Sequence, residues 1–196
     1  MTREAPHLFT SARERRLWLW TLVVVVAIYS TLGLARSLAG ALGDRGLLGA
    51  GAFITGCLLV LATVVTSGLR RRPGGAEVFV ALGVAAAYLL VFVRMAIPTE
   101  RSHVVEYGVV AVLVHEALSE RALGGRRVPV PAVLAVVVTT LVGAVDEGLQ
   151  AFLPSRVFDP VDMLFNALAA LLAVGASVAL AWARRRGSGG VETGGS

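Results

Sequence analysis

Two adjacent acidic residues, Asp146 and Glu147, stand at the end of the apolar run 128–145, and Gln150 follows them. In a helix, Asp146 and Gln150 share one face and Glu147 lies about 100° round the axis. Two carboxylates held together in apolar surroundings repel each other, so one of the pair is expected to hold a proton near neutral pH. Such an arrangement separates a general acid from a general base, and we expect Asp146 or Glu147 to act as the base in a proton transfer.

A second polar group interrupts an apolar segment earlier in the chain, at His103, Glu106 and Tyr107. Their spacing of three and four residues places them on one helical face. Charged groups inside a bilayer are costly, so these side chains are expected to face the protein interior and not the lipid. His103 is therefore a candidate second proton carrier beside the acidic pair.

A third polar group follows the acidic pair: Asp162 and Asn166 stand four residues apart, with Arg156 in the connection before them. Arg156 is a cation that could clamp a phosphate group. The sequence identifies no cofactor. A divalent metal ion is the less favoured alternative, and an oxygen-rich set of ligands would suit Mg²⁺ or Mn²⁺ better than Zn²⁺. The ligands in that case would be His103, Glu106, Asp146 and Asp162.

These residues also have structural interpretations, which the sequence leaves open. Asp162 could stabilise the N-terminus of a helix through the helix dipole. Asn166 could form a hydrogen bond between helices. Asp146, Glu147 and Gln150 could likewise form a polar clasp between helices without taking part in any reaction.

The composition of the chain suits lipid better than water. Hydrophobic residues make up 56% of the 196 residues and charged residues 16%, whereas roughly 25% are charged in a typical soluble protein. The mean hydropathy is +0.77. The composition also excludes a disordered chain and a disulfide scaffold, and the single cysteine, Cys57, is expected to be a small packing residue.

Apolar runs long enough to cross a bilayer predict an all-α, polytopic membrane protein: a helix bundle with six transmembrane helices. We expect the spans at residues 17–35, 46–69, 78–93, 103–118, 128–145 and 163–183. The fourth span is weak by hydropathy because it carries Glu106, His115 and Glu116. It is retained because six spans place both termini and most of the 18 basic residues, all arginine, in the cytoplasm, as the positive-inside rule requires.

Four segments follow from these spans: a cytoplasmic N-terminal segment, 1–16; a three-helix membrane part, 17–98; a second three-helix part with the polar groups, 99–183; and a basic, then disordered tail, 184–196. The three polar groups would lie at the outer ends of their helices and form a negatively charged pocket open to the outside. The cytoplasmic arginines account for the pI near 10.6, which argues against a nucleic-acid partner. Membrane lipids are the expected partners, and the sequence does not indicate an oligomeric state.

The stretch 146–166, DEGLQAFLPSRVFDPVDMLFN, resembles the VanZ-like membrane-protein family. The positions that match the pattern of that family are Glu147, Gln150, Phe152, Pro154, Arg156, Asp162 and Asn166. The upstream stretch 100–108, ERSHVVEYG, resembles the other characteristic block of the family, with His103, Glu106 and Tyr107. One departure is Ala169, which stands where the family often has a glycine.

The resemblance implies an integral membrane protein of bacteria, in a family named for a protein linked to low-level teicoplanin resistance. We therefore expect a multi-pass protein of the bacterial inner membrane that binds or processes a cell-envelope lipid or a lipid-linked cell-wall precursor, with a role in glycopeptide antibiotic resistance. Two alternatives stay open: a non-catalytic membrane scaffold and a small proton-coupled transporter. The sequence does not decide whether the chain is an enzyme.

Overall fold

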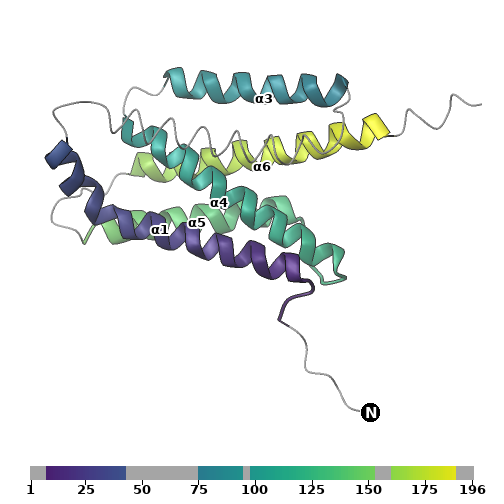
Figure 1. Cartoon of the computed structure of the whole chain (residues 1–196), viewed down its shortest axis with the longest axis horizontal. Helices are drawn as coiled ribbons and strands as arrows, with labels where there is room; N and C mark the ends of the chain where they lie inside the picture. Colours follow the sequence, from purple (N-terminus) through teal and green to yellow (C-terminus); the bar gives the residue numbers. More distant parts are fainter. Residues whose placement is uncertain (1–7, 43–74, 95–97, 153–159, 189–196) are drawn as a thin grey trace, which may run out of the picture.

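The computed structural model describes residues 8–42, 75–94, 98–152 and 160–188, and every regular element in these ranges is an α-helix (Figure 1). The helices are α1 (Ala12–Leu42), α3 (Gly75–Arg94), α4 (Pro98–Leu123), α5 (Pro131–Gln150) and α6 (Pro160–Ser188). The predicted all-helical fold is therefore confirmed. The second predicted span, 46–69, lies outside the described residues, as does Cys57.

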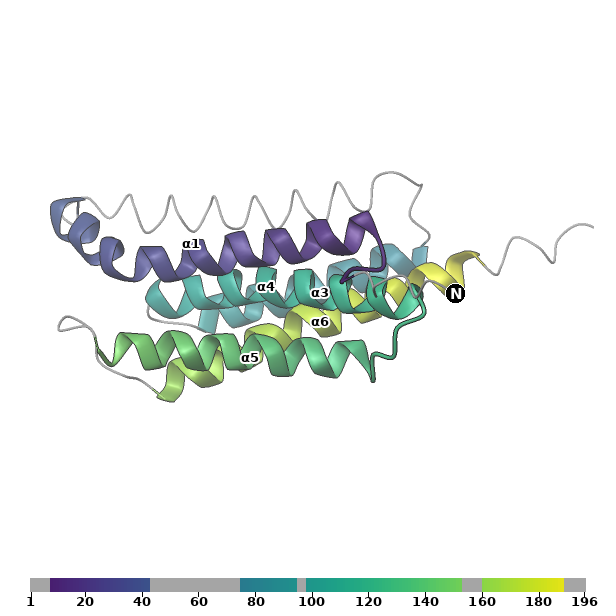
Figure 2. The ribbon, with the colours of Figure 1, turned by 90° about the horizontal axis from the view of Figure 1, so that it is seen from below.

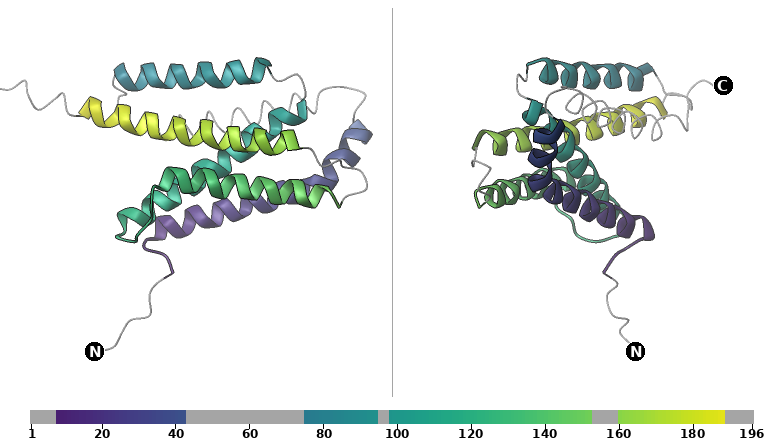
Figure 3. Two further views of the ribbon diagram at one scale, coloured as in Figure 1. Left: turned by 180° about the vertical axis from the view of Figure 1, so that it is seen from behind. Right: turned by 60° about the vertical axis from the view of Figure 1, so that its left-hand side comes forward.

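α4 lies at the centre of the described bundle, where it packs against α1, α5 and α6. Arg13 at the start of α1 pairs with Glu120 at the end of α4, and the two helices run antiparallel (Figure 2). α6 runs in the same direction as α4, and α5 runs opposite to both (Figures 1 and 2). α3 packs on α6, which therefore lies between α3 and α5 (Figure 3).

The central position of α4 explains how a helix of low hydropathy belongs to this bundle. Its buried face includes Val104, Tyr107 and Val110, and it shares the core with the small, buried residues Ala169 and Ala170 of α6. Because α1, α5 and α6 pack around α4, its polar side chains have protein neighbours. Hydropathy, which depends on the sequence of the helix alone, does not register these neighbours. Ala169 is fully buried, so alanine supports close packing at the position where the resembled family often has glycine.

α5 is polar on the inside and apolar on the outside. Its exposed stripe recurs every four residues, at Val133, Val137, Leu141, Val145 and Leu149. Its buried face consists of Ala135, Thr139, Gly143, Asp146, Glu147 and Gln150. A surface helix of a soluble protein shows the opposite distribution. The pattern of α5 therefore suits a bundle that is surrounded by lipid.

Two helices are long and apolar enough to cross a membrane: Pro131–Gln150, with a hydropathy of 1.8, and Pro160–Arg186, with a hydropathy of 2.1. In each of them only 28% of the apolar window is buried, whereas a core helix of a soluble protein is mostly buried. α3 adds a shorter apolar stretch, Val78–Ala87. Two candidate spans are the part of the predicted membrane architecture that the described residues support.

Candidate functional site

The predicted acidic pair lies near the end of α5, on the face that packs into the bundle. Asp146 and Glu147 are completely buried, and Gln150 is 1% exposed. The side-chain amide of Gln150 donates to Asp146 Oδ2 at 3.3 Å and to Glu147 Oε1 at 3.2 Å. α5 begins at Pro131, a position in the first turn where proline is favoured. The helix continues past the apolar run 128–145 to Gln150, so Asp146 and Glu147 are helical residues. One amide therefore holds two carboxylates in a region closed to solvent.

Two tyrosines from other helices face Asp146. Tyr107 of α4 is completely buried and interacts with the Asp146 carboxylate, and Tyr29 of α1 interacts with the same carboxylate. The Tyr29 hydroxyl also donates to the carbonyl oxygen of Val142 at 2.8 Å. Tyr107 was predicted from the sequence, whereas Tyr29 was missed. The signal that could have found Tyr29 is a side chain with a hydrogen-bonding group deep in an otherwise apolar span.

Asn166 of α6 reaches the same region from a third neighbouring helix. It is completely buried and packs against Gly143 of α5, where an added Cβ would lie 2.7 Å from Asn166 Nδ2 and 2.8 Å from Asn166 Cβ. Asn166 therefore occupies space that only a glycine leaves free. We call the following six residues the buried polar cluster: Tyr29, Tyr107, Asp146, Glu147, Gln150 and Asn166.

Of the other predicted site residues, Glu106 interacts electrostatically with Tyr107 of the buried polar cluster. Glu106 on α4 and Asp162 on α6 are partly buried, and Asp162 lies in the first turn of its helix, where the helix dipole favours an acid. His103 belongs to α4, but its side chain lies outside the described residues, as does the whole of Arg156. Among the residues that the structure describes, no group of three or more potential ligands is placed to hold a metal ion.

Within the described ranges, two buried oxygen atoms on the inner face of α5, Asp146 Oδ1 and Thr139 Oγ1, have no hydrogen-bond partner. A buried acceptor without a partner costs about 1–3 kcal/mol, and more when it is charged. The cost falls when a carboxylate takes up a proton or binds a donor. Asp146 Oδ1 is therefore placed to accept a hydrogen bond from a donor group of a ligand.

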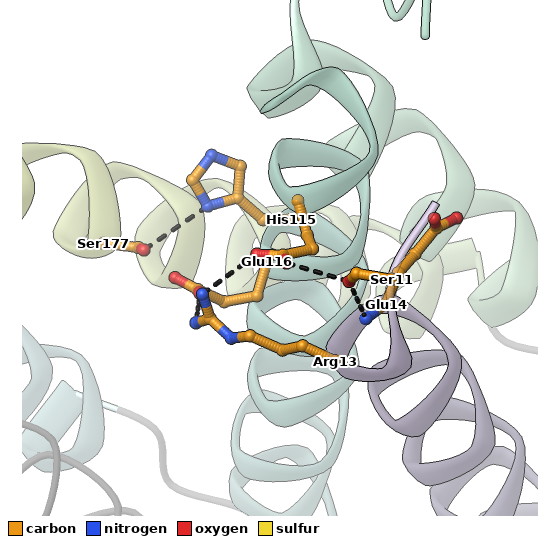
Figure 4. Close-up of polar contacts among 7 residues, drawn as sticks. Ser11, Arg13, Glu14, His115, Glu116 and Ser177 are labelled. Atoms are coloured by element: carbon orange, nitrogen blue, oxygen red, sulfur yellow. Dashed lines mark hydrogen bonds and ion pairs between the residues drawn. The ribbon is translucent and has the colours of Figure 1, made fainter. Parts of the chain in front are cut away.

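A second polar network joins the start of α1 to the end of α4 (Figure 4). Ser11 caps α1, because its Oγ accepts a hydrogen bond of 3.0 Å from the Glu14 backbone N–H. The Glu14 carboxylate accepts from the Thr10 backbone N–H at 2.6 Å and from the Arg121 guanidinium at 3.2 Å. Ser11 and Glu14 have the spacing of a capping box, and this spacing is a signal in the sequence that could have predicted where α1 begins.

The same network holds the polar residues near the end of α4. Arg13 pairs with Glu116 at 2.8 Å and with Glu120 at 3.0 Å, and His115 lies 3.3 Å from the Ser177 hydroxyl of α6 (Figure 4). His115 and Glu116 are therefore partnered away from the buried polar cluster. This agrees with helix geometry for His115, which stands nine residues after Glu106 and so lies on roughly the opposite face of α4.

Glu14 predicts a pH-dependent stability of this network. Burial raises the pKa of Glu14, but hydrogen bonds from the backbone and side chain of Thr10 and the charge of Arg121 outweigh burial, and the net pKa lies below its ordinary value of 4.5. The stabilisation is therefore fully present above pH 4.5 and is lost as the pH falls through the lowered pKa. At pH 7 we expect Glu14→Gln to lower the free energy of unfolding by about 1–3 kcal/mol, measured by thermal unfolding of the purified protein.

The matched control is Glu116→Gln, because its ion pair with Arg13 is much more exposed: the Glu116 side chain is 38% exposed and that of Glu14 is fully buried. Exposed ion pairs contribute about 0–1 kcal/mol, so this variant should unfold close to the wild type. The difference between wild type and Glu14→Gln should shrink on acidification. A difference that stays constant down to about pH 3, well below the ordinary carboxyl pKa, would contradict the lowered pKa.

The comparisons with known proteins provide no family for this chain. The sequence matches no protein-family model, no curated protein and no solved structure. Function is therefore inferred from the site itself and from the resemblance of the stretches 100–108 and 146–166.

Proposed function

We propose that this chain is a bacterial inner-membrane protein of the VanZ-like family, with six transmembrane helices and both termini in the cytoplasm. Most of the described arginines lie at one end of the bundle: at the start of α1, the end of α4, the α4–α5 connection and the end of α6 (Figures 1 and 2). The acidic pair and Asp162 lie toward the other end. The positive-inside rule assigns the arginine end to the cytoplasm, so the buried polar cluster belongs to the outer half of the membrane.

In this proposal, the buried polar cluster binds or processes the head group of a cell-envelope lipid or of a lipid-linked cell-wall precursor. The observation that carries it is the fully buried Asp146 carboxylate, whose Oδ1 has no hydrogen-bond partner among the residues that the structure describes. A substrate hydroxyl or ammonium group that reaches Oδ1 supplies the missing donor. Asp146 or Glu147 then serves as the base, and Gln150 holds both carboxylates in place.

The hydrogen bonds of the acidic pair with Gln150 bear on the scaffold alternative. Both lie within α5, so they do not tie one helix to another. Contacts that join helices come from Tyr29, which donates to Val142, and from Asn166, which packs on Gly143. Tyr107 of α4 and Tyr29 of α1 also interact with the Asp146 carboxylate. Asp146 therefore takes part in contacts between helices, and the Asp146→Asn variant distinguishes the scaffold alternative from a chemical role.

One observation favours a second candidate, a proton-coupled transporter. Every member of the buried polar cluster except Tyr29 is at most 1% exposed, and enclosed intramembrane carboxylates are typical of proton relays. In a transporter, the donor that reaches Asp146 is a proton delivered through the protein. Proton flux in proteoliposomes that depends on Asp146 would favour this candidate over lipid processing.

The proposal is tested in the native bacterium with a deletion strain and the same strain complemented by the wild-type gene. Mass spectrometry of envelope lipids and lipid-linked precursors should show one species whose abundance changes on deletion and returns on complementation. Growth in teicoplanin is the accompanying readout, because the resemblance implies a change in sensitivity. Identical lipid and precursor pools in the two strains would contradict a role in envelope-lipid chemistry.

A further inference from the structure

An apolar groove runs along the outside of the bundle between α5 and α6, remote from the buried polar cluster. Its cavity volume is about 610 Å³. α5 and α6 lie side by side in all views (Figures 2 and 3), and several lining side chains, such as Val137 and Leu171, are half exposed. The apolar lining consists of Ala132, Val133, Val136, Val137, Leu171, Val174, Gly175, Val178 and Ala179.

The groove ends at the arginine end of the bundle, against Trp182 and Arg185. The guanidinium of the next residue, Arg186, lies 4.2 Å from the centre of the Trp182 ring, so Arg186 is engaged in a cation–π contact. Within the part of the chain that the structure describes, Arg185 makes no ion pair. The groove therefore has apolar walls, the Trp182 indole at its end and, among the described residues, an arginine that no ion pair neutralises.

We propose that this groove binds an anionic phospholipid, with one acyl chain along α5 and α6 and the phosphate on Arg185. The apolar lining suits an acyl chain. Trp182 would lie at the membrane–water interface, where tryptophan is enriched. Basic pockets between helices on the cytoplasmic side bind anionic head groups, and Arg185 supplies the basic group here. The inference depends on the proposed membrane placement of the chain. It is independent of the chemistry at Asp146.

Gly175 shows that the groove has room for a ligand. A Cβ added at Gly175 would meet no atom within 4 Å, although the residue lines the groove in the middle of α6. Gly175→Leu should therefore fill the groove without a collision inside the protein. Gly83 of α3 also has no atom within 4 Å of an added Cβ and does not line the groove, so Gly83→Leu is a matched control.

The experiment uses Trp182 as the reporter, in the full chain with Trp18→Phe and Trp20→Phe, reconstituted in phosphatidylcholine vesicles. Tail-brominated phosphatidylglycerol is compared with tail-brominated phosphatidylcholine as a quencher at equal fractions. A basic residue near the membrane surface contributes about 1 kcal/mol toward an anionic lipid, so we expect association about fivefold in favour of the anionic lipid. Arg185→Gln should bring the two lipids to parity, whereas Arg184→Gln, which removes the same charge beside the groove, should keep the preference.

Gly175→Leu should reduce quenching by both lipids, and Gly83→Leu should leave it unchanged. Equal quenching by the two lipids in the wild type would overturn the proposal, as would a preference that survives Arg185→Gln. Absence of quenching by either lipid would also overturn it and would mean that protein, such as a second copy of the chain, covers the groove. Co-flotation of the chain with the vesicles is measured separately, so that failure of the membrane placement is distinguished from failure of the groove.

Discussion

Asp146→Asn is expected to abolish the function of the chain and to leave its stability close to that of the wild type. The asparagine oxygen can still accept from the Gln150 amide, and the new amide replaces Oδ1, which has no hydrogen-bond partner among the described residues. A buried charge is also removed, and its desolvation cost is removed with it. The apparent unfolding free energy should therefore change by less than about 1 kcal/mol. General-base catalysis contributes about 10²–10⁴-fold to a rate, so the variant should fail to restore the lipid pools of the deletion strain.

The matched control for this variant is Thr139→Val, on the same buried face of α5. It also removes a buried oxygen that has no hydrogen-bond partner in the described part of the chain, at nearly the same side-chain shape, and should restore the lipid pools fully. Two results would count against the proposal. Full restoration by Asp146→Asn would show that the charge is not used, and a parallel loss of folded protein and function would show that Asp146 is structural.

The sequence predicted which residues of α5 belong to the buried polar cluster better than it predicted the residues that other helices bring to it. Asp146, Glu147 and Gln150 could be assigned to one region because they lie within one turn of a helix, where spacing determines the face. Tyr29 could not be assigned in this way, since it comes from α1 and its contact with Val142 depends on how two helices pack. Local periodicity indicates which face of a helix is polar, and it does not identify the residue that lies opposite.

The same limit applies to the two ends of the bundle. Charge counts predicted an arginine-rich end, and the network of Arg13, Glu14 and Arg121 lies there. They did not predict that Glu14 is fully buried, because burial follows from the close approach of α1 to α4. Hydropathy likewise ranked α4 lowest among the spans, although α4 packs against three of the other described helices. Hydropathy measures how well a helix suits contact with lipid. It therefore underrates a central helix such as α4, whose contacts are mainly with other helices.

Gly143→Ala is expected to destabilise the protein, because Asn166 fills the space beside Gly143. The new Cβ would lie 2.7 Å from Asn166 Nδ2, 2.8 Å from Asn166 Cβ and 3.0 Å from Asn166 Cγ. The amide nitrogen can rotate away, but Cβ of Asn166 moves only with the backbone of α6. Overpacking of this kind costs about 1–3 kcal/mol, which should appear as a lower melting temperature of the purified protein.

Gly148→Ala is the matched control, on the same helix but away from the collision. An added Cβ at Gly148 meets no atom within 4 Å, so only the helix propensity changes, and alanine should stabilise α5 by about 0.5–1 kcal/mol. The two substitutions are chemically identical and should have opposite signs. Asn166→Ala removes the amide and with it part of the collision, so it should cost less in the Gly143→Ala background than in the wild type. Equal stability of both glycine variants would mean that α6 does not approach α5 closely at Asn166, and the buried polar cluster would lose its contribution from that helix.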